Sequence, residues 1–179
     1  MKLRETQLGP LWTFEDGTIA RALDNGQWWD AHLRPILDER PVGAAVDIGA
    51  HIGWFTVYLA QTHRTVLAVE PQPAAFRALQ QNVLDRGLAH VWCWPIAAYD
   101  RHVVLGHDAR NDASDTGGFS YTLWGAASCV VGMPLDPLVS MLLSNRPLTL
   151  IKCDAQGADL RALMGLHRTI QRDRPLIIF

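Results

Sequence analysis

Short apolar segments alternate along the chain with stretches whose apolar residues recur at helical spacing. The apolar segments predict core strands at 44–48, 65–69, 90–97, 148–153 and 176–179. Helical spacing predicts helices over 18–40, 54–62, 73–84 and 158–172. Strands that alternate with helices form a parallel sheet covered on both faces, so we expect an α/β, doubly wound, mostly parallel sheet.

The length of 179 residues predicts a single domain. We expect a helical lead-in over 1–43 and a sheet core over 44–179, with an insertion near 101–135 that adds short strands at 103–105 and 129–131. The chain stops inside an apolar segment, which leaves two expectations. Either the sequence is a fragment, or the sheet is shortened at its C-terminal side and a homo-oligomer or a partner protein covers that edge.

Composition excludes several classes of protein. A hydrophobic content of 49% with 19% charged residues is typical of a globular domain rather than a disordered one. The net charge of −2 and the lack of a basic patch do not favour a nucleic-acid partner. Three cysteines without a C-x-x-C pair, and scattered histidines, predict reduced thiols and no metal site. With no signal peptide and no apolar run long enough for a membrane span, we expect a cytoplasmic protein.

The clearest chemistry follows the first predicted core strand. The segment V-D-I-G-A-H-I-G at 46–53 joins a carboxylate, Asp47, to two glycines, Gly49 and Gly53. Glycines let backbone N–H groups and a helix N-terminus approach a polar ligand closely. The second core strand ends in Glu70, 21 residues after Gly49, near the ~20 residues expected for an acid that binds a ribose. The pattern therefore predicts a cofactor that contains a nucleoside.

The spacing of the glycines distinguishes between two cofactors that contain a nucleoside, a dinucleotide and S-adenosylmethionine. A dinucleotide site has G-x-G-x-x-G, whereas this chain has G-x-x-x-G directly after Asp47. A carboxylate there would repel a pyrophosphate but suits the amino group or sulfonium of S-adenosylmethionine. A nucleotide-dependent oxidoreductase is therefore the weaker alternative, and a plain strand-to-helix turn leaves Glu70 unexplained.

Taken together and in order, the motifs resemble those of the FkbM family of S-adenosylmethionine-dependent methyltransferases. The segment at 46–53 resembles the family's V-D-I/V-G-A-N-I-G, and Glu70-Pro71 resembles its E-P motif. The segments L-D-P-L at 135–138 and I-K-C-D-A-Q-G-A-D at 151–159 resemble its L-D-x-L and I-K-I-D-V-E-G-A-E motifs. The resemblance spans roughly 44–179 and implies a Rossmann-like class I methyltransferase fold.

The resemblance also implies an activity, namely O-methylation of a hydroxyl group on a sugar, glycan or natural product. Three departures from the family pattern concern polar residues: His51 replaces an asparagine, Gln156 replaces a glutamate, and Asp159 replaces a glutamate. Gln156 and the stop of the chain inside an apolar segment leave, as the alternative, a module that binds S-adenosylmethionine but has lost catalysis or depends on a partner.

The expected cofactor-binding residues lie in the glycine loop and after the strands: Asp47, Gly49, Ala50, His51, Gly53, Glu70, Pro71, Ala97 and Asp154. Glu70 is expected to receive both ribose hydroxyls, and Ala97 to lie where the adenine stacks. Asp154 and His51 are the catalytic candidates, as groups that remove the proton of the acceptor. Asp154 could equally hold the sulfonium region or bind a metal, although no second acid at ligand spacing predicts one, and capping of the next helix is its structural alternative. His51 could instead contact the substrate or serve as a polar loop residue. Trp28 and Trp29 either close the site or pack in the core, and Lys152 is assigned no role.

Overall fold

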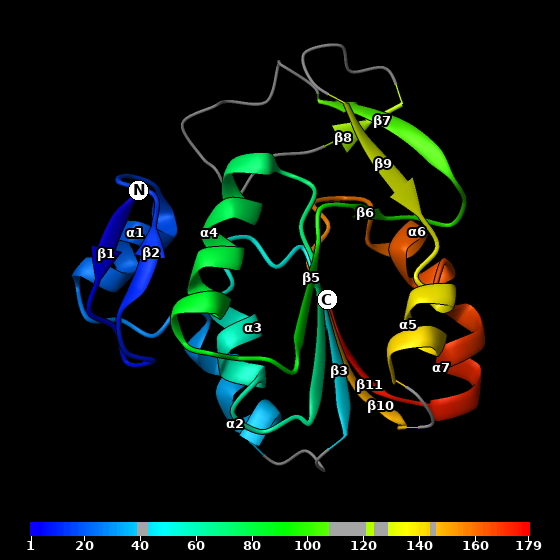
Figure 1. Cartoon of the computed structure of the whole chain (residues 1–179), viewed down its shortest axis with the longest axis horizontal. Helices are drawn as coiled ribbons and strands as arrows, with labels where there is room; N and C mark the ends of the chain where they lie inside the picture. The colour runs from blue at the N-terminus through cyan, green and yellow to red at the C-terminus, as the bar shows by residue number, and fades with distance from the viewer. Residues whose placement is uncertain (39–42, 108–120, 124–128, 144–145) are drawn as a thin grey trace.

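The computed structural model describes residues 1–38, 43–107, 121–123, 129–143 and 146–179. Five parallel strands form its central sheet in the spatial order β11-β10-β3-β4-β5 (Figure 1). They are β3 (Ala44–Ile48), β4 (Thr65–Val69), β5 (Val91–Trp94), β10 (Leu148–Cys153) and β11 (Leu176–Ile178). The chain order reverses between β3 and β10, and ligands of doubly wound sheets bind outside the carboxyl ends of the strands at such a point. The predicted fold class is confirmed.

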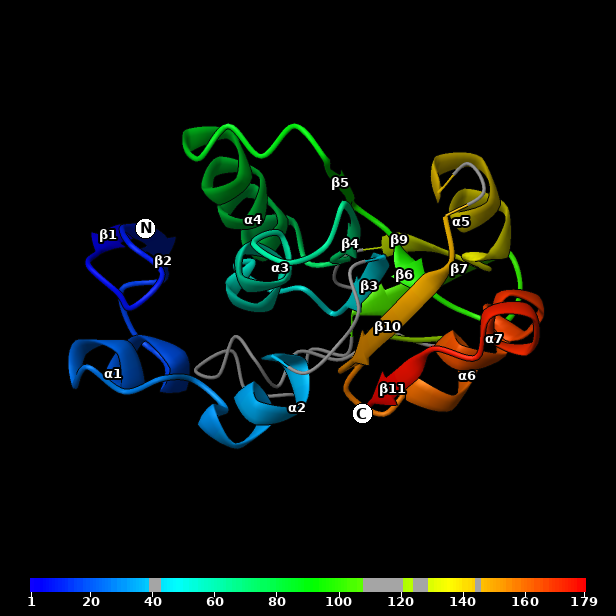
Figure 2. The ribbon, with the colours of Figure 1, turned by 90° about the horizontal axis from the view of Figure 1, so that it is seen from below.

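Helices cover both faces of this sheet. On one face lie α3 (Trp54–Leu59) and α4 (Pro73–Asp85), and on the other lie α5 (Asp136–Leu143), α6 (Asp159–Met164) and α7 (His167–Asp173) (Figure 2). All residues of β3 and β4 are buried, which is why these strands are almost entirely apolar in the sequence, with Asp47 and Thr65 as their polar residues. No helix among the described residues has the length and apolar character needed to cross a membrane.

A second, smaller sheet contains the described part of the insertion predicted near 101–135. Its spatial order is β6-β9-β7-β8, and β9 pairs with β6 in parallel and with β7 antiparallel. The strands are β6 (Ala97–Ala98), β7 (Val103–His107), β8 (Tyr121–Thr122) and β9 (Cys129–Met133). Much of the insertion, at 108–120 and 124–128, lies outside the described residues.

Two predicted elements are interrupted. The strand expected over 90–97 ends at Trp94 because Pro95 has no N–H group to continue the ladder, and the chain then joins the second sheet as β6. The helix expected over 158–172 is split at Gly165. A Cβ atom there would lie 2.1 Å from the carbonyl oxygen of Tyr99, so the close backbone approach requires a glycine. Helix α5 has no counterpart among the predicted elements.

The N-terminal part is less helical than expected. It begins with an antiparallel hairpin of β1 (Lys2–Arg4) and β2 (Leu11–Thr13). The single helix expected over 18–40 is replaced by α1 (Thr18–Asp24), the 3-10 turn η1 (Ala31–Leu33) and α2 (Arg34–Asp38). The short strands escaped detection because three residues are too few to establish an alternating pattern.

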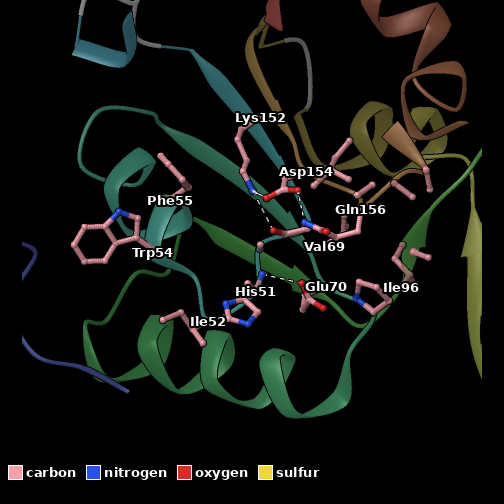
Figure 3. A pocket seen from close by; sticks show the side chains of 18 of the residues that line it. His51, Ile52, Trp54, Phe55, Val69, Glu70, Ile96, Lys152, Asp154 and Gln156 are labelled. Atoms are coloured by element: carbon pink, nitrogen blue, oxygen red, sulfur yellow. Dashed lines mark hydrogen bonds and ion pairs between the residues drawn. The ribbon is translucent and has the colours of Figure 1, made fainter. Parts of the chain in front are cut away.

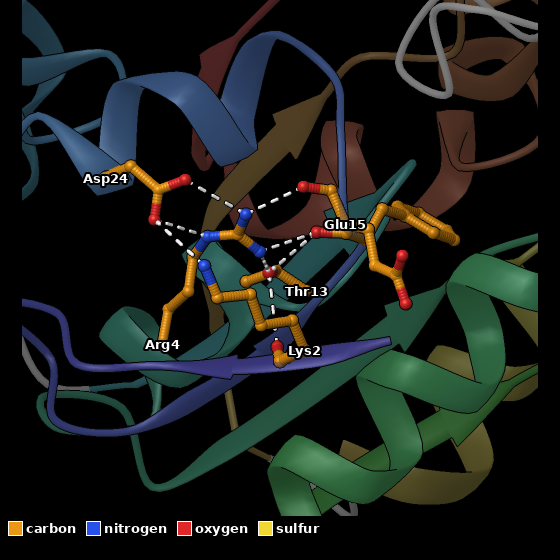
Figure 4. A network of polar contacts seen from close by, with 6 residues as sticks. Lys2, Arg4, Thr13, Glu15 and Asp24 are labelled. Atoms are coloured by element: carbon orange, nitrogen blue, oxygen red, sulfur yellow. Dashed lines mark hydrogen bonds and ion pairs between the residues drawn. The ribbon is translucent and has the colours of Figure 1, made fainter.

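Two buried polar side chains hold this N-terminal part in place. Arg4 donates hydrogen bonds to both carboxylate oxygens of Asp24, at 2.8 and 3.0 Å, and to the carbonyl oxygen of Glu15 at 2.8 Å (Figure 4). Asn82, fully buried in α4, pairs with the backbone of Trp12 through N–H and C=O at 2.7 and 2.9 Å. The same amide donates to the carbonyl oxygen of Ile52 at 2.8 Å. Asn82 therefore connects the hairpin to the glycine loop, residues 49–53, which contains Ile52.

Candidate functional site

A cavity of about 300 Å³ lies at the carboxyl ends of β3, β4 and β10, at the reversal of strand order (Figure 3). Of the nine residues expected to bind a cofactor, seven line it: Gly49, Ala50, His51, Glu70, Pro71, Ala97 and Asp154. Asp47 and Gly53 are not in the lining. The topology thus brings together residues that are spread over about a hundred positions of the chain.

The glycine loop between β3 and α3 is held tightly between two strand ends. The N–H groups of Gly49 and Ala50 both donate to the carbonyl oxygen of Val69, at 3.0 and 3.1 Å. Gly49 has a φ of +71°, and a Cβ atom there would lie 2.0 Å from the carbonyl oxygen of Asp154. Both conditions require glycine. Gly53, with a φ of +87°, immediately precedes α3, where it sets the direction of the helix rather than lining the cavity.

Glu70 is almost completely buried and faces the cavity from the end of β4. Its Oε2 atom accepts a hydrogen bond from the N–H group of His51, and its Oε1 atom accepts one from that of Gln72, both at 2.8 Å. Burial raises the pKa of Glu70 to about 7, although the two backbone hydrogen bonds act in the opposite direction. The carboxylate is therefore fixed in one orientation, and each oxygen keeps lone pairs for further donors.

Asp47 lies behind the cavity wall and is fully buried. Its Oδ2 atom accepts a hydrogen bond from the hydroxyl group of Thr56 at 2.6 Å, and its Oδ1 atom lies 3.5 Å from Nζ of Lys152. From this position Asp47 connects α3 to Lys152 and holds the loop between them. A direct contact with a ligand has no support from the lining of the cavity.

Lys152 lines the cavity, although sequence analysis gave it no role. Its ammonium group donates to the carbonyl oxygen of Gly49 at 3.1 Å and lies 3.9 Å from Oδ2 of Asp154. The sequence did contain an indication of a role, because Lys152 is the one charged residue of the predicted core strand at 148–153. A charged residue in a buried strand is rarely there without a partner.

Asp154 follows β10 at the mouth of the cavity and is about half exposed. Its Oδ1 atom accepts a hydrogen bond from the side-chain amide of Gln156 at 2.8 Å. The alternative role as a helix cap is not supported, because Asp159 accepts the N–H groups of Ala155 and Gly157, at 2.6 and 3.2 Å. Asp154 is therefore available to a ligand.

His51 and the N-terminal residues form the opposite wall. The ring of His51 lies 5.4 Å from that of Phe14, measured between centroids. Trp29 lines the cavity together with Thr18 and Ile19 of α1, whereas Trp28 packs edge-on against core aromatic rings. The contribution of α1 was missed, because it depends on how the N-terminal part packs on the sheet.

The residues after β5 give the cavity an apolar side. Ile96, Ala97, Ala98 and Leu105 line it there, while the charged groups gather at the ends of β4 and β10. Within the described ranges, no group of three or more histidine, cysteine or acidic residues is arranged to hold a metal ion.

One solved structure with a TM-score above 0.5 supports the fold. A methyltransferase FkbM from Methylobacillus flagellatus matches with a TM-score of 0.52 and 21% sequence identity, over 76% of this chain and 32% of that protein. An rRNA methylase from Streptococcus thermophilus matches with a TM-score of 0.45 and 13% identity, over 89% of this chain and 67% of that protein. The chain thus spans about a third of the length of the FkbM structure. No curated protein matches it.

The family model described as the methyltransferase FkbM domain matches residues 47–179. That range contains the glycine loop, Glu70 and Asp154. It also contains the end of β3 and all of β4, β5, β10 and β11. The family expected from the motifs is confirmed, and the chain belongs to the FkbM methyltransferase domain family.

Proposed function

We propose that this chain binds S-adenosylmethionine in the cavity and transfers its methyl group to a hydroxyl group on a sugar, glycan or natural product. The observation that carries the proposal is the orientation of Glu70. Two backbone N–H groups hold its carboxylate toward the cavity, and a ribose offers two neighbouring hydroxyl donors to such an acceptor.

The remaining walls suit the other parts of this cofactor. The apolar side at Ile96, Ala97 and Leu105 suits an adenine ring. Among the described residues in or behind the cavity wall, the acids Asp47, Glu70 and Asp154 outnumber the cation Lys152. An excess of negative charge favours a positively charged sulfonium over a pyrophosphate, and this supports a methyl donor over a dinucleotide.

The chemistry requires little beyond position and a proton acceptor. S-adenosylmethionine supplies a methyl group bonded to a positively charged sulfur. Asp154 is the proposed acceptor of the hydroxyl proton, because it is half exposed at the cavity mouth and Gln156 fixes its orientation. His51 is the second candidate, from the opposite wall. Holding two reactants in line contributes about 7–11 kcal/mol in favourable cases.

The alternative of a binding module without turnover rests on one contact. Gln156 stands where the family motif has a glutamate, and its amide occupies one oxygen of Asp154 at 2.8 Å. That contact engages one lone pair of the carboxylate that would receive the proton. The two functions share the cofactor and differ only in whether methyl transfer occurs.

Cofactor binding is tested by calorimetric titration of S-adenosylhomocysteine into the wild type, Glu70→Ala and the control Glu5→Ala, which changes an exposed glutamate. We expect Glu70→Ala to weaken binding about 10- to 100-fold, the range of a hydrogen bond to a charged group, and Glu5→Ala to leave it unchanged. Absence of binding to the folded wild type would refute the proposal. Binding of NADH in its place would favour the oxidoreductase alternative.

Transfer is tested with radiolabelled S-adenosylmethionine and matched panels of hydroxyl and amine acceptors. We expect label in hydroxyl compounds only, and we expect Asp154→Asn to lose transfer by a much larger factor than it loses affinity for S-adenosylhomocysteine. A wild type that binds the cofactor but labels no acceptor would favour the binding module.

A further inference from the structure

Lys152 is a buried cation that the proposed function leaves without a task. The chain has two lysines. The side chain of Lys2 is 57% exposed on the N-terminal hairpin, whereas that of Lys152 is 10% exposed at the end of β10. Burying an ammonium group is unfavourable unless partners compensate for the lost water. Such a position therefore calls for an explanation.

The protein supplies only part of that compensation. An ammonium group has three N–H donors. Among the described residues it makes one hydrogen bond, to the carbonyl oxygen of Gly49 at 3.1 Å. The carboxylate oxygens of Asp47 and Asp154 lie at 3.5 and 3.9 Å, distances that permit charge attraction but exceed ordinary hydrogen bonds. Lys152 therefore retains donor capacity, and it lines the cavity (Figure 3).

The charges around Lys152 restrict the kind of ligand that fits. Two carboxylates and one ammonium give this end of the cavity a net negative charge, which opposes a ligand that carries only negative charge. A zwitterion avoids the conflict, because its carboxylate can face Lys152 while its ammonium faces Asp154, the acid of the pair that lines the cavity. An α-amino acid is such a group, and one forms the end of S-adenosylmethionine.

The opposite side of the cavity cannot take this group. Ile96, Ala97 and Leu105 offer no charge partner there, and Glu70 between the two sides is already the proposed ribose acceptor. Resting on the proposed function, we propose that Lys152 binds the α-carboxylate of the cofactor and so selects ligands that carry an intact amino acid. This assignment gives the buried ammonium its missing acceptor.

The test compares ligands that differ only at this end. Calorimetry measures binding of S-adenosylhomocysteine, which has the amino acid, and of 5′-methylthioadenosine, which lacks it. In Lys152→Met we expect S-adenosylhomocysteine to bind about 10- to 100-fold more weakly, and 5′-methylthioadenosine to bind within about twofold of the wild type. The preference between the two should persist in Lys152→Arg, which keeps the charge, and in the matched control Lys2→Met.

A second ligand pair isolates the carboxylate from the rest of the amino acid. Decarboxylated S-adenosylmethionine keeps the amine and the sulfonium. The wild type should prefer S-adenosylmethionine to it by a similar factor of about 10- to 100-fold, and Lys152→Met should bind the two alike. If Lys152→Met fails to fold because Asp47 loses its cation, the double variant Asp47→Asn/Lys152→Met removes both charges and is measured in its place.

The outcomes separate this inference from the proposed function. An equal loss of affinity for both ligands in Lys152→Met would show a structural role and overturn the inference. An unchanged preference would overturn it as well, while leaving cofactor binding intact. A folded wild type that binds none of these ligands would overturn the inference and the proposed function together.

Discussion

The buried carboxylate of Glu70 should make the stability of the protein depend on pH. Water is excluded from this group, so ionisation in the folded state is less favourable than in the unfolded chain. Burial raises the pKa of Glu70 from 4.5 to about 7, against the opposing effect of the hydrogen bonds from Gln72 and His51. The perturbation that isolates the effect is Glu70→Gln, which removes ionisation and nearly keeps the shape.

The direction and size of the effect follow from proton linkage. Below pH 4.5 the glutamic acid is protonated in both states, and its contribution to stability is fully present. As the pH rises toward about 7, the unfolded chain releases the proton and the folded protein holds it, so the free energy of unfolding falls. A raised pKa of this size corresponds to about 3 kcal/mol lost by pH 8.

Urea unfolding at pH 5, 6, 7 and 8 measures this loss. The free energy of unfolding of the wild type minus that of Glu70→Gln should fall by most of those ~3 kcal/mol across the series. Any unfavourable contact of the new amide adds a constant that does not change with pH. The same difference for Glu5→Gln, at an exposed site, should stay flat. A flat difference for Glu70→Gln, or one that rises with pH, would refute the reasoning.

Three further predictions concern the glycine loop at 49–53 and the two residues that hold it, Glu70 and Asn82. Affinity for S-adenosylhomocysteine should fall below the raised pKa of Glu70, about 7, by at most the ~10- to 100-fold expected for Glu70→Ala, and level off above that pKa, as titration calorimetry would show. Gly49→Ala should destabilise the protein by more than about 3 kcal/mol in urea unfolding, whereas Gly87→Ala, also at positive φ but with open space around it, should cost about 1–2 kcal/mol. Asn82→Ala should cost about 3 kcal/mol and speed hydrogen exchange in the N-terminal hairpin, whereas Gln81→Ala, with one exposed hydrogen bond, should do neither. Equal effects in either pair would contradict the roles given to Gly49 and Asn82.

The central sheet could be predicted because its strands are buried on both faces. Strands β3, β4 and β10 have the predicted boundaries, since apolar residues dominate each of them and only Asp47, Thr65, Thr149 and Lys152 are polar. The interruptions were harder to predict. Apolar spacing continues across Pro95 and Gly165, and Gly165 is needed only because Tyr99 comes close in three dimensions.

Some residues of the candidate site could be predicted from the sequence, and others could not. Glu70 and Gly49 could be found from the sequence because they follow strands at a spacing that reflects a local β-α-β unit. Trp29 was one of two tryptophans considered for closing the site, whereas the wall at Thr18 and Ile19 depends on the packing of the N-terminal part, which no local pattern encodes. Lys152 could have been identified from its charge within an apolar strand. Its partners at Asp47 and Gly49, however, lie about a hundred residues away in the chain.

One backbone contact explains why the loop and the far strand act together. The Cα atom of Gly49 lies against the carbonyl oxygen of Asp154 without room for a Cβ atom, and its own carbonyl oxygen accepts the hydrogen bond of Lys152. The ends of β3 and β10 are therefore fixed to each other in the folded chain before any ligand binds. Groups held in this way do not have to be ordered by the ligand, which lowers the entropic cost of binding and of aligning reactants. A substitution at Gly49 should consequently disturb the position of Asp154 as well as the glycine loop, and loss of methyl transfer should accompany loss of cofactor affinity.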